Sequence, residues 1–265
     1  MIHIKIPHLQ ISRMRNNKLI YGIGLLLLAL VVLYIGSDIS SGSFFSKRRD
    51  GQLQNAQDSM LIPNVTAIVS ECDCDIEIIP SNEERVVMFY DKKDHRNNSD
   101  YTNSTLHLDF SSAGSSFHFF EHSSNVKVKV YCKSLSSITQ SGVGDVKTRN
   151  TLSAENLTIT NEGVGDMNLE IDTKMLTVKN TGVGDVKLKG NTLSSVISNE
   201  GTGDVEAKNL NNKVAEVANS GVGDVDVFAT DSLDLNNSGV GDINYKGAAH
   251  VSSIISEGVG KVEKK

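Results

Sequence analysis

The sequence is poor in the residues that fill most globular cores. Its 265 residues include no Trp, only 5% aromatic residues, and three Pro, the last of which is Pro80. A long stretch without Pro is typical of hydrogen-bonded β-ladders, because Pro has no amide proton to donate. Gly is frequent, with 22 residues, but this little Pro excludes a collagen-like chain, and three Cys are too few for a disulfide-rich scaffold.

Positive charge is scarce outside the N-terminal segment. Residues 51–265 hold 19 Lys and Arg against 30 Asp and Glu, whereas residues 1–50 hold seven against two. Binding to nucleic acid requires a basic face that neutralises phosphates. We therefore expect no nucleic-acid partner. The sequence also contains no convincing nucleophilic triad or phosphate-binding loop, and we expect neither a cofactor nor a resident metal ion.

Residues 19–36 contain no charged residue and are just long enough to span a bilayer as a helix. Basic residues precede this run, which by the positive-inside rule keeps residues 1–18 in the cytoplasm. We predict an uncleaved signal anchor at 19–36, which contacts the membrane, and a solvated linker at 37–59. The rest would be a single-pass protein's exported body, in the periplasm or outside the cell. Cleavage after Ser37 is the alternative, and Lys47 to Arg49 weaken the charge asymmetry.

A short motif returns seven times in the second half of the chain. It begins as S-G-V-G-D-V at 141–146 and ends as E-G-V-G-K-V at 257–262, with intervals of 18 to 21 residues. The flanks alternate Val, Ile and Thr with polar residues, which indicates strands. The two glycines of each copy are expected to form structural turns. They are Gly142, Gly144, Gly163, Gly165, Gly182, Gly184, Gly201, Gly203, Gly221, Gly223, Gly239, Gly241, Gly258 and Gly260.

Aligning the copies gives three aliphatic columns. They stand four residues before the first Gly, between the two glycines, and after the Asp, beginning with Ile138, Val143 and Val146. Repeats of this length bury apolar side chains only by stacking on their neighbours. We therefore predict an all-β fold, a right-handed parallel β-helix with coils of about 19 residues over 136–265. All three columns are expected inside, and seven coils at ~4.8 Å would form a rod of about 34 Å.

Two further features refine this prediction. Five copies carry Asn two residues before the first Gly, and we expect a ladder of stacked amides there. Such Asn residues also tolerate left-handed backbone angles. Residues 60–135 are richer in aromatics, with strand-like runs at 85–90, 105–110 and 125–131, and are predicted to be an irregular β-region that caps the solenoid. E-C-D-C-D-I at 71–76 aligns with the glycine motif as an eighth copy.

The apolar N-terminal segment, the β-region and the run S-L-S-S-I-T-Q-S-G-V-G-D-V at 134–146 together resemble the putative autotransporter adhesin head GIN domain family of bacterial envelope proteins. The resemblance covers about residues 62–262. It implies a β-helix of pectin-lyase-like shape without catalytic residues, and an adhesive or surface role. Cys72 and Cys74 depart from the glycine pattern.

An aspartate follows the second glycine in six of the seven copies, and Lys261 replaces it in the last. Stacked carboxylates repel one another unless they are neutralised, so a cation-binding strip is one interpretation. The favoured one is that each carboxylate accepts backbone amides within its own turn. The column comprises Asp145, Asp166, Asp185, Asp204, Asp224 and Asp242.

Two smaller patterns carry chemistry. Cys72, Cys74 and Cys132 allow one disulfide, either between the first two or from one of them to Cys132, and free thiols are equally compatible with the spacing. The run from His118 to His122 matches the H-x-x-E-H pattern of zinc peptidases. That chemistry needs a helix, and the Ser-rich flanks favour an ordinary β-segment instead.

These observations predict a non-enzymatic, membrane-anchored β-helix protein of the cell envelope. It would act as an adhesin or surface interaction module that binds a glycan or protein ligand or associates with itself. A repetitive rod offers regular outer faces that suit such a role. The alternatives are a bactofilin-like scaffold that polymerises in the cytoplasm and a polysaccharide-active enzyme on a pectin-lyase-like helix.

Overall fold

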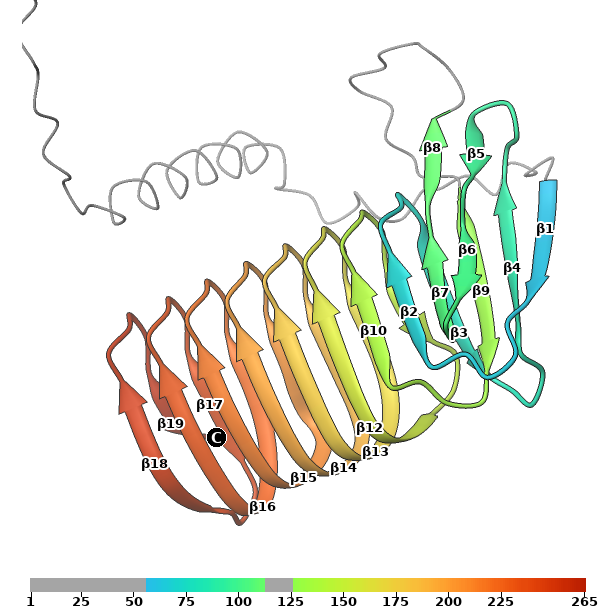
Figure 1. The fold of residues 1–265 in the computed structure, drawn as a ribbon. Coiled ribbons are helices and arrows are strands. Elements are labelled where there is room, and N and C mark those ends of the chain that lie inside the picture. The colour runs from blue at the N-terminus through green and yellow to red at the C-terminus, as the bar shows by residue number, and fades with distance from the viewer. Residues whose placement is uncertain (1–55, 113–125) are drawn as a thin grey trace, which may run out of the picture. The chain divides into compact units, whose positions relative to one another are not determined.

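The computed structural model describes residues 56–112 and 126–265, and every regular element in these two ranges is a strand (Figure 1). The all-β prediction is therefore confirmed. None of the described residues forms a helix that could cross a membrane. The predicted cytoplasmic segment, the anchor at 19–36, nearly all of the linker and the His118–His122 pattern lie outside the described residues.

The repetitive half of the chain is a stack of parallel strands, as Figure 1 shows. Each long strand pairs with the next in the register that the glycine motifs set, so that Ile159 lies opposite Val178 and Asn161 opposite Asn180. The strands are β10 (Ser137–Gln140), β11 (Val146–Thr148), β12 (Leu152–Asn161), β13 (Met167–Asn180), β14 (Val186–Asn199), β15 (Val205–Asn219), β16 (Val225–Asn237), β17 (Ile243–Lys246), β18 (His250–Ser256) and β19 (Val262–Lys264). The parallel solenoid is as predicted, and its right-handed winding stays a prediction.

Two of the three predicted aliphatic columns form the core. The column that begins with Ile138 is buried, except for Ile254 in the final coil, and the Val146 column is buried through Ile243. The column between the glycines was wrongly assigned to the interior, because its six valines are 39–72% exposed. The in-and-out alternation of the strand continues through the corner, so the glycines face inward and the residue between them faces outward.

The N-terminal strands add two coils to the stack. β2 (Ala67–Ser70) and β3 (Asp75–Pro80) pair in parallel with β10 and β11, which makes residues 71–76 an eighth corner. On the other side of this coil lie β7 (Thr105–Leu108) and β9 (Lys127–Cys132), also parallel. The coil formed by β7 and β9 comes second in the chain but lies at the N-terminal end of the stack, outside the coil formed by β2 and β3. The chain then returns past the first coil to begin β10, an order that the sequence did not predict.

Antiparallel strands cover the N-terminal end of the stack. β4 (Arg85–Tyr90) pairs with β9, β1 (Ala56–Leu61) pairs with β4, and β6 (Asp100–Thr102) pairs with β7. A separate pair consists of β5 (His95–Asn97) and β8 (Phe110–Ser112). Such strands protect a sheet edge from adding further strands. β1 begins inside the segment predicted as linker, and the strand-like runs predicted near β4, β7 and β9 are confirmed.

Candidate functional site

The glycine corners are shaped by close stacking of one coil on the next. The second glycine of each motif has a φ between +132° and +145°, a region that L-residues rarely adopt. A Cβ atom on either glycine would lie 2.0–2.4 Å from a carbonyl oxygen of the preceding corner. The glycines are therefore needed both for the turn and for the contact between coils. Their role in this geometry is structural.

The aspartate column holds successive corners together. In each coil the Asp Oδ1 accepts the backbone amide of the equivalent residue in the next coil, at 2.7–3.3 Å, from Asp75 through to the amide of Lys261. The donor amide was expected within the same turn, and the structure places it one coil away. One oxygen of each carboxylate thus replaces a carbonyl in the backbone ladder, and Lys261 ends the series.

The asparagine column forms the predicted ladder inside the corner. From Asn161 to Asn219 each amide nitrogen donates to the amide oxygen of the next Asn in the column, ending at Asn237, at 3.0–3.4 Å. Four of them also donate to the carbonyl of the second glycine in their own motif. All five are fully buried. None has a positive φ, so the tolerance of Asn for left-handed angles is not used here and hydrogen bonding explains the Asn.

The outward residues between the glycines form a stripe along the corner edge. We call it the valine stripe, and it consists of Val143, Val164, Val183, Thr202, Val222, Val240 and Val259. Every member is β-branched, including the one that is polar. Branching at Cβ restricts the backbone to extended angles, which matters between two flexible glycines. Thr202 therefore indicates that shape rather than hydrophobicity is what this position requires.

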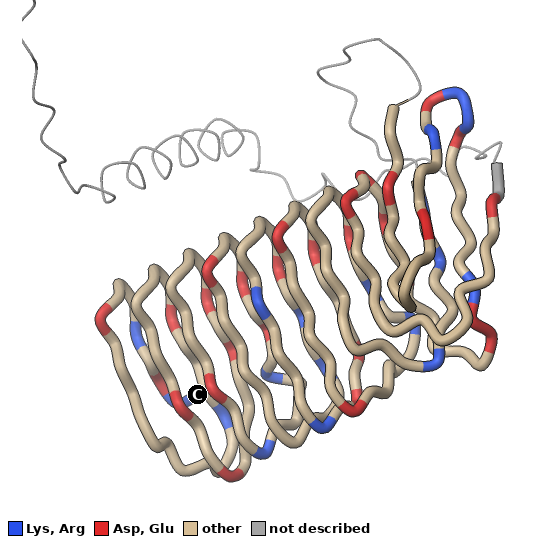
Figure 2. The backbone as a smooth tube through the Cα atoms, viewed as in Figure 1, with Lys and Arg blue, Asp and Glu red and all other residues tan. Residues whose placement is uncertain are grey.

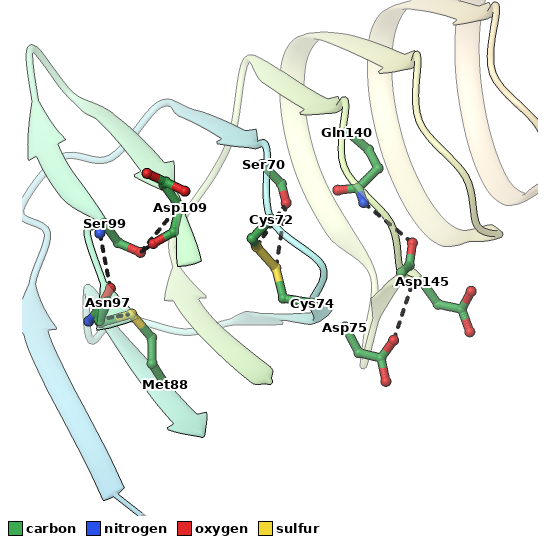
Figure 3. Close-up of a disulfide and its surroundings, with 11 residues drawn as sticks. Ser70, Cys72, Cys74, Asp75, Met88, Asn97, Ser99, Asp109, Gln140 and Asp145 are labelled. Atoms are coloured by element: carbon green, nitrogen blue, oxygen red, sulfur yellow. Dashed lines mark hydrogen bonds between the residues drawn. A yellow bond between two sulfur atoms is a disulfide. The ribbon is translucent and has the colours of Figure 1, made fainter. Parts of the chain in front are cut away.

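The cysteine corner differs from the glycine corners. Cys72 and Cys74 are bonded to each other with their Cα atoms 5.4 Å apart, and both are buried (Figure 3). The bridges that link successive corners begin between Asp73 and Val143 and continue only toward the C-terminus within the described residues. Cys132 is a buried free thiol, and burial, aided by Glu84, raises its pKa to about 12.

The strands β12–β16 bend along the edge opposite the glycine corners (Figure 1). Residues of this bend line a groove. Strand pairing is interrupted at this bend in each coil, as at Lys174 between the pairs of Thr173 and Met175. The groove has a volume of about 790 Å³. We call it the coil groove, and it is lined by Ser134, Ser153, Ala154, Glu155, Asp172, Thr173, Lys174, Asn191, Thr192, Leu193, Asn211, Asn212, Lys213 and Thr230.

Buried polar side chains line part of the coil groove. Thr173 donates to Thr192 at 3.0 Å, and Thr192 donates to the Ser194 carbonyl at 3.0 Å. Asn212 is 1% exposed and donates to the carbonyls of Leu210 and Phe228. Its Oδ1 has no hydrogen-bond partner among the described residues. The same holds for buried atoms elsewhere in the solenoid, such as Asn161 Oδ1 in the asparagine ladder, so an unpaired acceptor does not by itself mark the groove as a site.

Exposed side chains, most of them polar but one of them Leu193, form the two walls of the coil groove. On one wall the amide of Asn211 donates to Asn191 at 3.0 Å. On the other, Lys174 forms an ion pair with Glu155 at 2.7 Å, while Lys213 has no ion-pair partner in the part of the chain that the structure describes. Opposite charges balance along this edge, whereas Asp and Glu recur along the glycine corners (Figure 2). The two edges therefore suit different ligands.

Cross-coil ion pairs cover the face that follows the aspartate column. Lys187 pairs with Glu206 at 3.1 Å, and Lys208 pairs with Asp226 at 2.9 Å. The hydrogen bond to Glu206 raises the pKa of Lys187. Burial opposes ionisation of Asp226, but hydrogen bonds from Lys208 and Asn244 outweigh it and lower its pKa. These charges satisfy one another between coils, so they are structural.

The coil groove was missed because the sequence was aligned on the glycines. The polar residues at the glycine corners repeat from coil to coil, as structural residues do. At the bend, by contrast, one wall reads Ser153, Asp172, Asn191 and Asn211. Variation within an otherwise regular repeat was the available signal. No cluster of three or more His, Cys, Asp or Glu able to hold a metal occurs among the described residues.

Comparison with known proteins agrees with this architecture. A family model described as putative auto-transporter adhesin, head GIN domain, matches residues 64–249. The crystal structure of a putative adhesin from Bacteroides fragilis is similar, with a TM-score of 0.73 and 26% identity over 80% of this chain and 97% of that chain. No curated protein matches significantly.

Two structures at lower identity share the fold. One is a putative adhesin from Parabacteroides merdae, with a TM-score of 0.59 and 21% identity over 79% of this chain and 96% of that chain. The other is described as a putative lipid binding protein from Parabacteroides distasonis, with a TM-score of 0.58 and 20% identity over the same shares. All three structures are matched over nearly their full lengths.

Proposed function

Because the chain belongs to the head GIN domain family of putative auto-transporter adhesins, we propose that it is an envelope adhesin whose solenoid binds a surface ligand. Residues 19–36 anchor it as a single-pass protein, and residues 60–265 are exported to the periplasm or the cell exterior. The cap at 60–135 and the right-handed helix at 136–265 form the exported body. The protein is not an enzyme and uses no cofactor.

The coil groove is the observation that supports this proposal most. A rod held together by repeated hydrogen bonds needs no groove of varying side chains, yet one follows the bend of five successive strands. Long grooves and repetitive outer surfaces are what solenoid proteins use for binding. The carboxylates of the aspartate column, which would be the obvious source of acid–base chemistry, are committed to amides between coils.

Export is tested by fusing alkaline phosphatase, which is active only outside the cytoplasm, to Lys265 of the full chain. We expect an active fusion. The same fusion lacking residues 19–36 is the matched control and should be inactive, because it has lost the segment that directs export. An inactive full-length fusion would contradict the proposal and favour the bactofilin-like cytoplasmic scaffold.

A further inference from the structure

We infer that two copies of this chain associate end to end, with β18 of one copy pairing in antiparallel orientation with β18 of the other. This inference goes beyond the proposed function and depends on neither export nor a surface ligand. Among the described residues, β18 pairs with β16 and β19 with β17, and no strand lies on their outer sides (Figure 1). The outer backbone groups of β18 therefore form a sheet edge that can accept another strand.

The coil at this end exposes apolar side chains that the other coils bury. Ile254 is 50% exposed, whereas Leu235, at the same position of the preceding coil, is fully buried. Val251 and Val262 are also only partly buried, although they pack against the core. Arrays of repeats normally end in a unit with a polar outer face. A second copy that continued the sheet would cover these side chains.

β18 lacks the features by which a sheet edge avoids pairing. Its sequence, H-V-S-S-I-I-S, contains neither Pro nor Lys, Arg, Asp or Glu. A bulge can also protect an edge, and the register with β16 shifts once, next to Leu233. The pairing is regular from Asp234 to Asn237, so residues 253–256 of β18 offer an undistorted edge to a partner strand.

The charges around β18 suit an antiparallel pair. β18 runs from the turn at 247–249 to the next glycine corner, so antiparallel pairing places the corner of one copy beside the turn of the other. Glu257 is exposed at the corner, and Lys246 is exposed before the turn. Two-fold symmetry thus brings a carboxylate and an ammonium group to each end of the paired strands, which favours this orientation.

A head-to-tail filament fits the molecule less well. It would require open strands at the N-terminal end, but β7 pairs with both β2 and β6, and β9 pairs with both β3 and β4. The strand that covers β7 is β6, which has three residues and offers little edge for β18. Contact between two C-terminal ends uses the same surface on both copies and therefore closes at a dimer.

The first test measures the mass of the full-length chain in detergent micelles by light scattering, with the detergent contribution subtracted. We expect twice the 28.7 kDa of one chain. Ile255→Lys places a charge on the exposed β18 edge and should weaken dimerisation by about tenfold or more. The matched control is Asn236→Lys, which adds the same charge at the position that pairs with Ile255 in the preceding coil and should leave the dimer intact.

The second test is cross-linking in membranes of cells that produce the full chain. Ser253→Cys lies on β18, and a short bis-maleimide should join it to its counterpart in the other copy. Thr177→Cys, an exposed position on β13, should give no covalent dimer. Unchanged circular-dichroism spectra of all four variants would show that the comparisons report association rather than unfolding.

Four results would overturn the inference. They are a monomeric native chain, equal dimerisation of Ile255→Lys and the native chain, equal cross-linking at positions 253 and 177, and masses that grow beyond two copies with concentration. Equal dimerisation of Ile255→Lys would assign the contact to another part of the chain. The proposed function fails separately, through an inactive phosphatase fusion, and a monomeric protein with an active fusion would leave it standing.

Discussion

Single atoms decide whether a coil can stack on its neighbour. Gly203 has a φ of +135°, and a Cβ there would lie 2.2 Å from the Gly184 carbonyl oxygen. We predict that Gly203→Ala lowers the free energy of unfolding by more than about 3 kcal/mol, because backbone must move in two coils. Chemical denaturation measures this loss. Ser220→Ala, at an exposed corner position, is the control, and equal stability of the two variants would show that the corners do not stack as described.

Substitutions in the aspartate column can distinguish the stabilising effect of its hydrogen bonds from the effect of its negative charges. Asp204 Oδ1 accepts the amide of Asp224 at 2.8 Å. Asp204→Asn keeps an acceptor and removes one of several like charges, so we expect stability within about 0.5 kcal/mol of the native chain. Asp204→Ala leaves the amide without its acceptor and should cost about 1–3 kcal/mol. Urea titrations of both variants decide the matter.

Equal destabilisation by the two Asp204 substitutions would instead assign the column's role to its charge. The cation-binding interpretation makes a different prediction, namely that calcium raises the melting temperature. We expect no such rise in the native chain, since one oxygen of each carboxylate already holds an amide. A calcium-dependent increase that disappears in Asp204→Asn would contradict the structural role.

The buried thiol of Cys132 predicts a dependence on alkaline pH. Its pKa is raised from an ordinary value near 9 to about 12, mainly by burial. The contribution of the protonated thiol to the free energy of unfolding is complete below the ordinary pKa. It is lost as pH rises toward 12, because the unfolded chain then releases a proton that the folded chain retains. Cys132→Val removes this group while leaving the titration of Tyr90 in place.

Unfolding measured between pH 8 and pH 11 should therefore show a shallower decline for Cys132→Val than for the native chain. Identical slopes would mean that Cys132 is ionised as easily in the folded state as in the unfolded one. Alkylation after denaturation without reductant is a companion measurement. One modified cysteine is expected, since Cys72 and Cys74 are bonded to each other.

At the scale of the element, the asparagine ladder joins coils inside the corner. Asn199 accepts from Asn180 and donates to Asn219 and to the Gly203 carbonyl. We predict that Asn199→Ala costs at least about 2 kcal/mol, because it leaves buried partners unpaired on both sides. Thermal unfolding compared with the exposed control Asn236→Ala checks this, and a shift no larger than the control's would show that the ladder contributes nothing.

The elements show what a repeat can and cannot predict. Strand identity and register followed from the spacing of the glycines, and the buried amides followed from Asn161 and its counterparts. The inward placement of Val143 did not hold, because alternation counted from Gln140 puts the small glycines, not the valine, on the inner side. Aligning the copies identified the three aliphatic columns, but it did not show which columns face the interior and which face the solvent.

The order in which the first two coils stack could not be predicted from the sequence either. Residues 71–76 can be predicted to form a corner because they resemble the glycine motif. The coil formed by β7 and β9 carries no such motif in its sequence. Nothing local indicates that β7 lies outside β2 rather than between β2 and β10. This choice is made by long-range packing, as in the pairing of β9 with β4.

At the scale of the whole described solenoid, the two ends and the two edges differ. β1, β4 and β6 cover the N-terminal end, while among the described residues no strand pairs with the outer side of β18. Asp and Glu recur along the glycine edge (Figure 2), which is built from repeated structural bonds. The opposite edge holds the variable coil groove. Structural uniformity on one edge leaves the other free to vary, and this division supports a binding role for the groove.

The central claim, that this solenoid binds a ligand outside the cell, is tested most directly by the adhesion of intact bacteria that produce the full chain. Cells would be washed over surfaces coated with a panel of glycans and matrix proteins, beside cells producing the chain without residues 19–36. We predict greater retention of the full-chain cells on at least one coating. Equal retention of both strains on every coating would contradict the account.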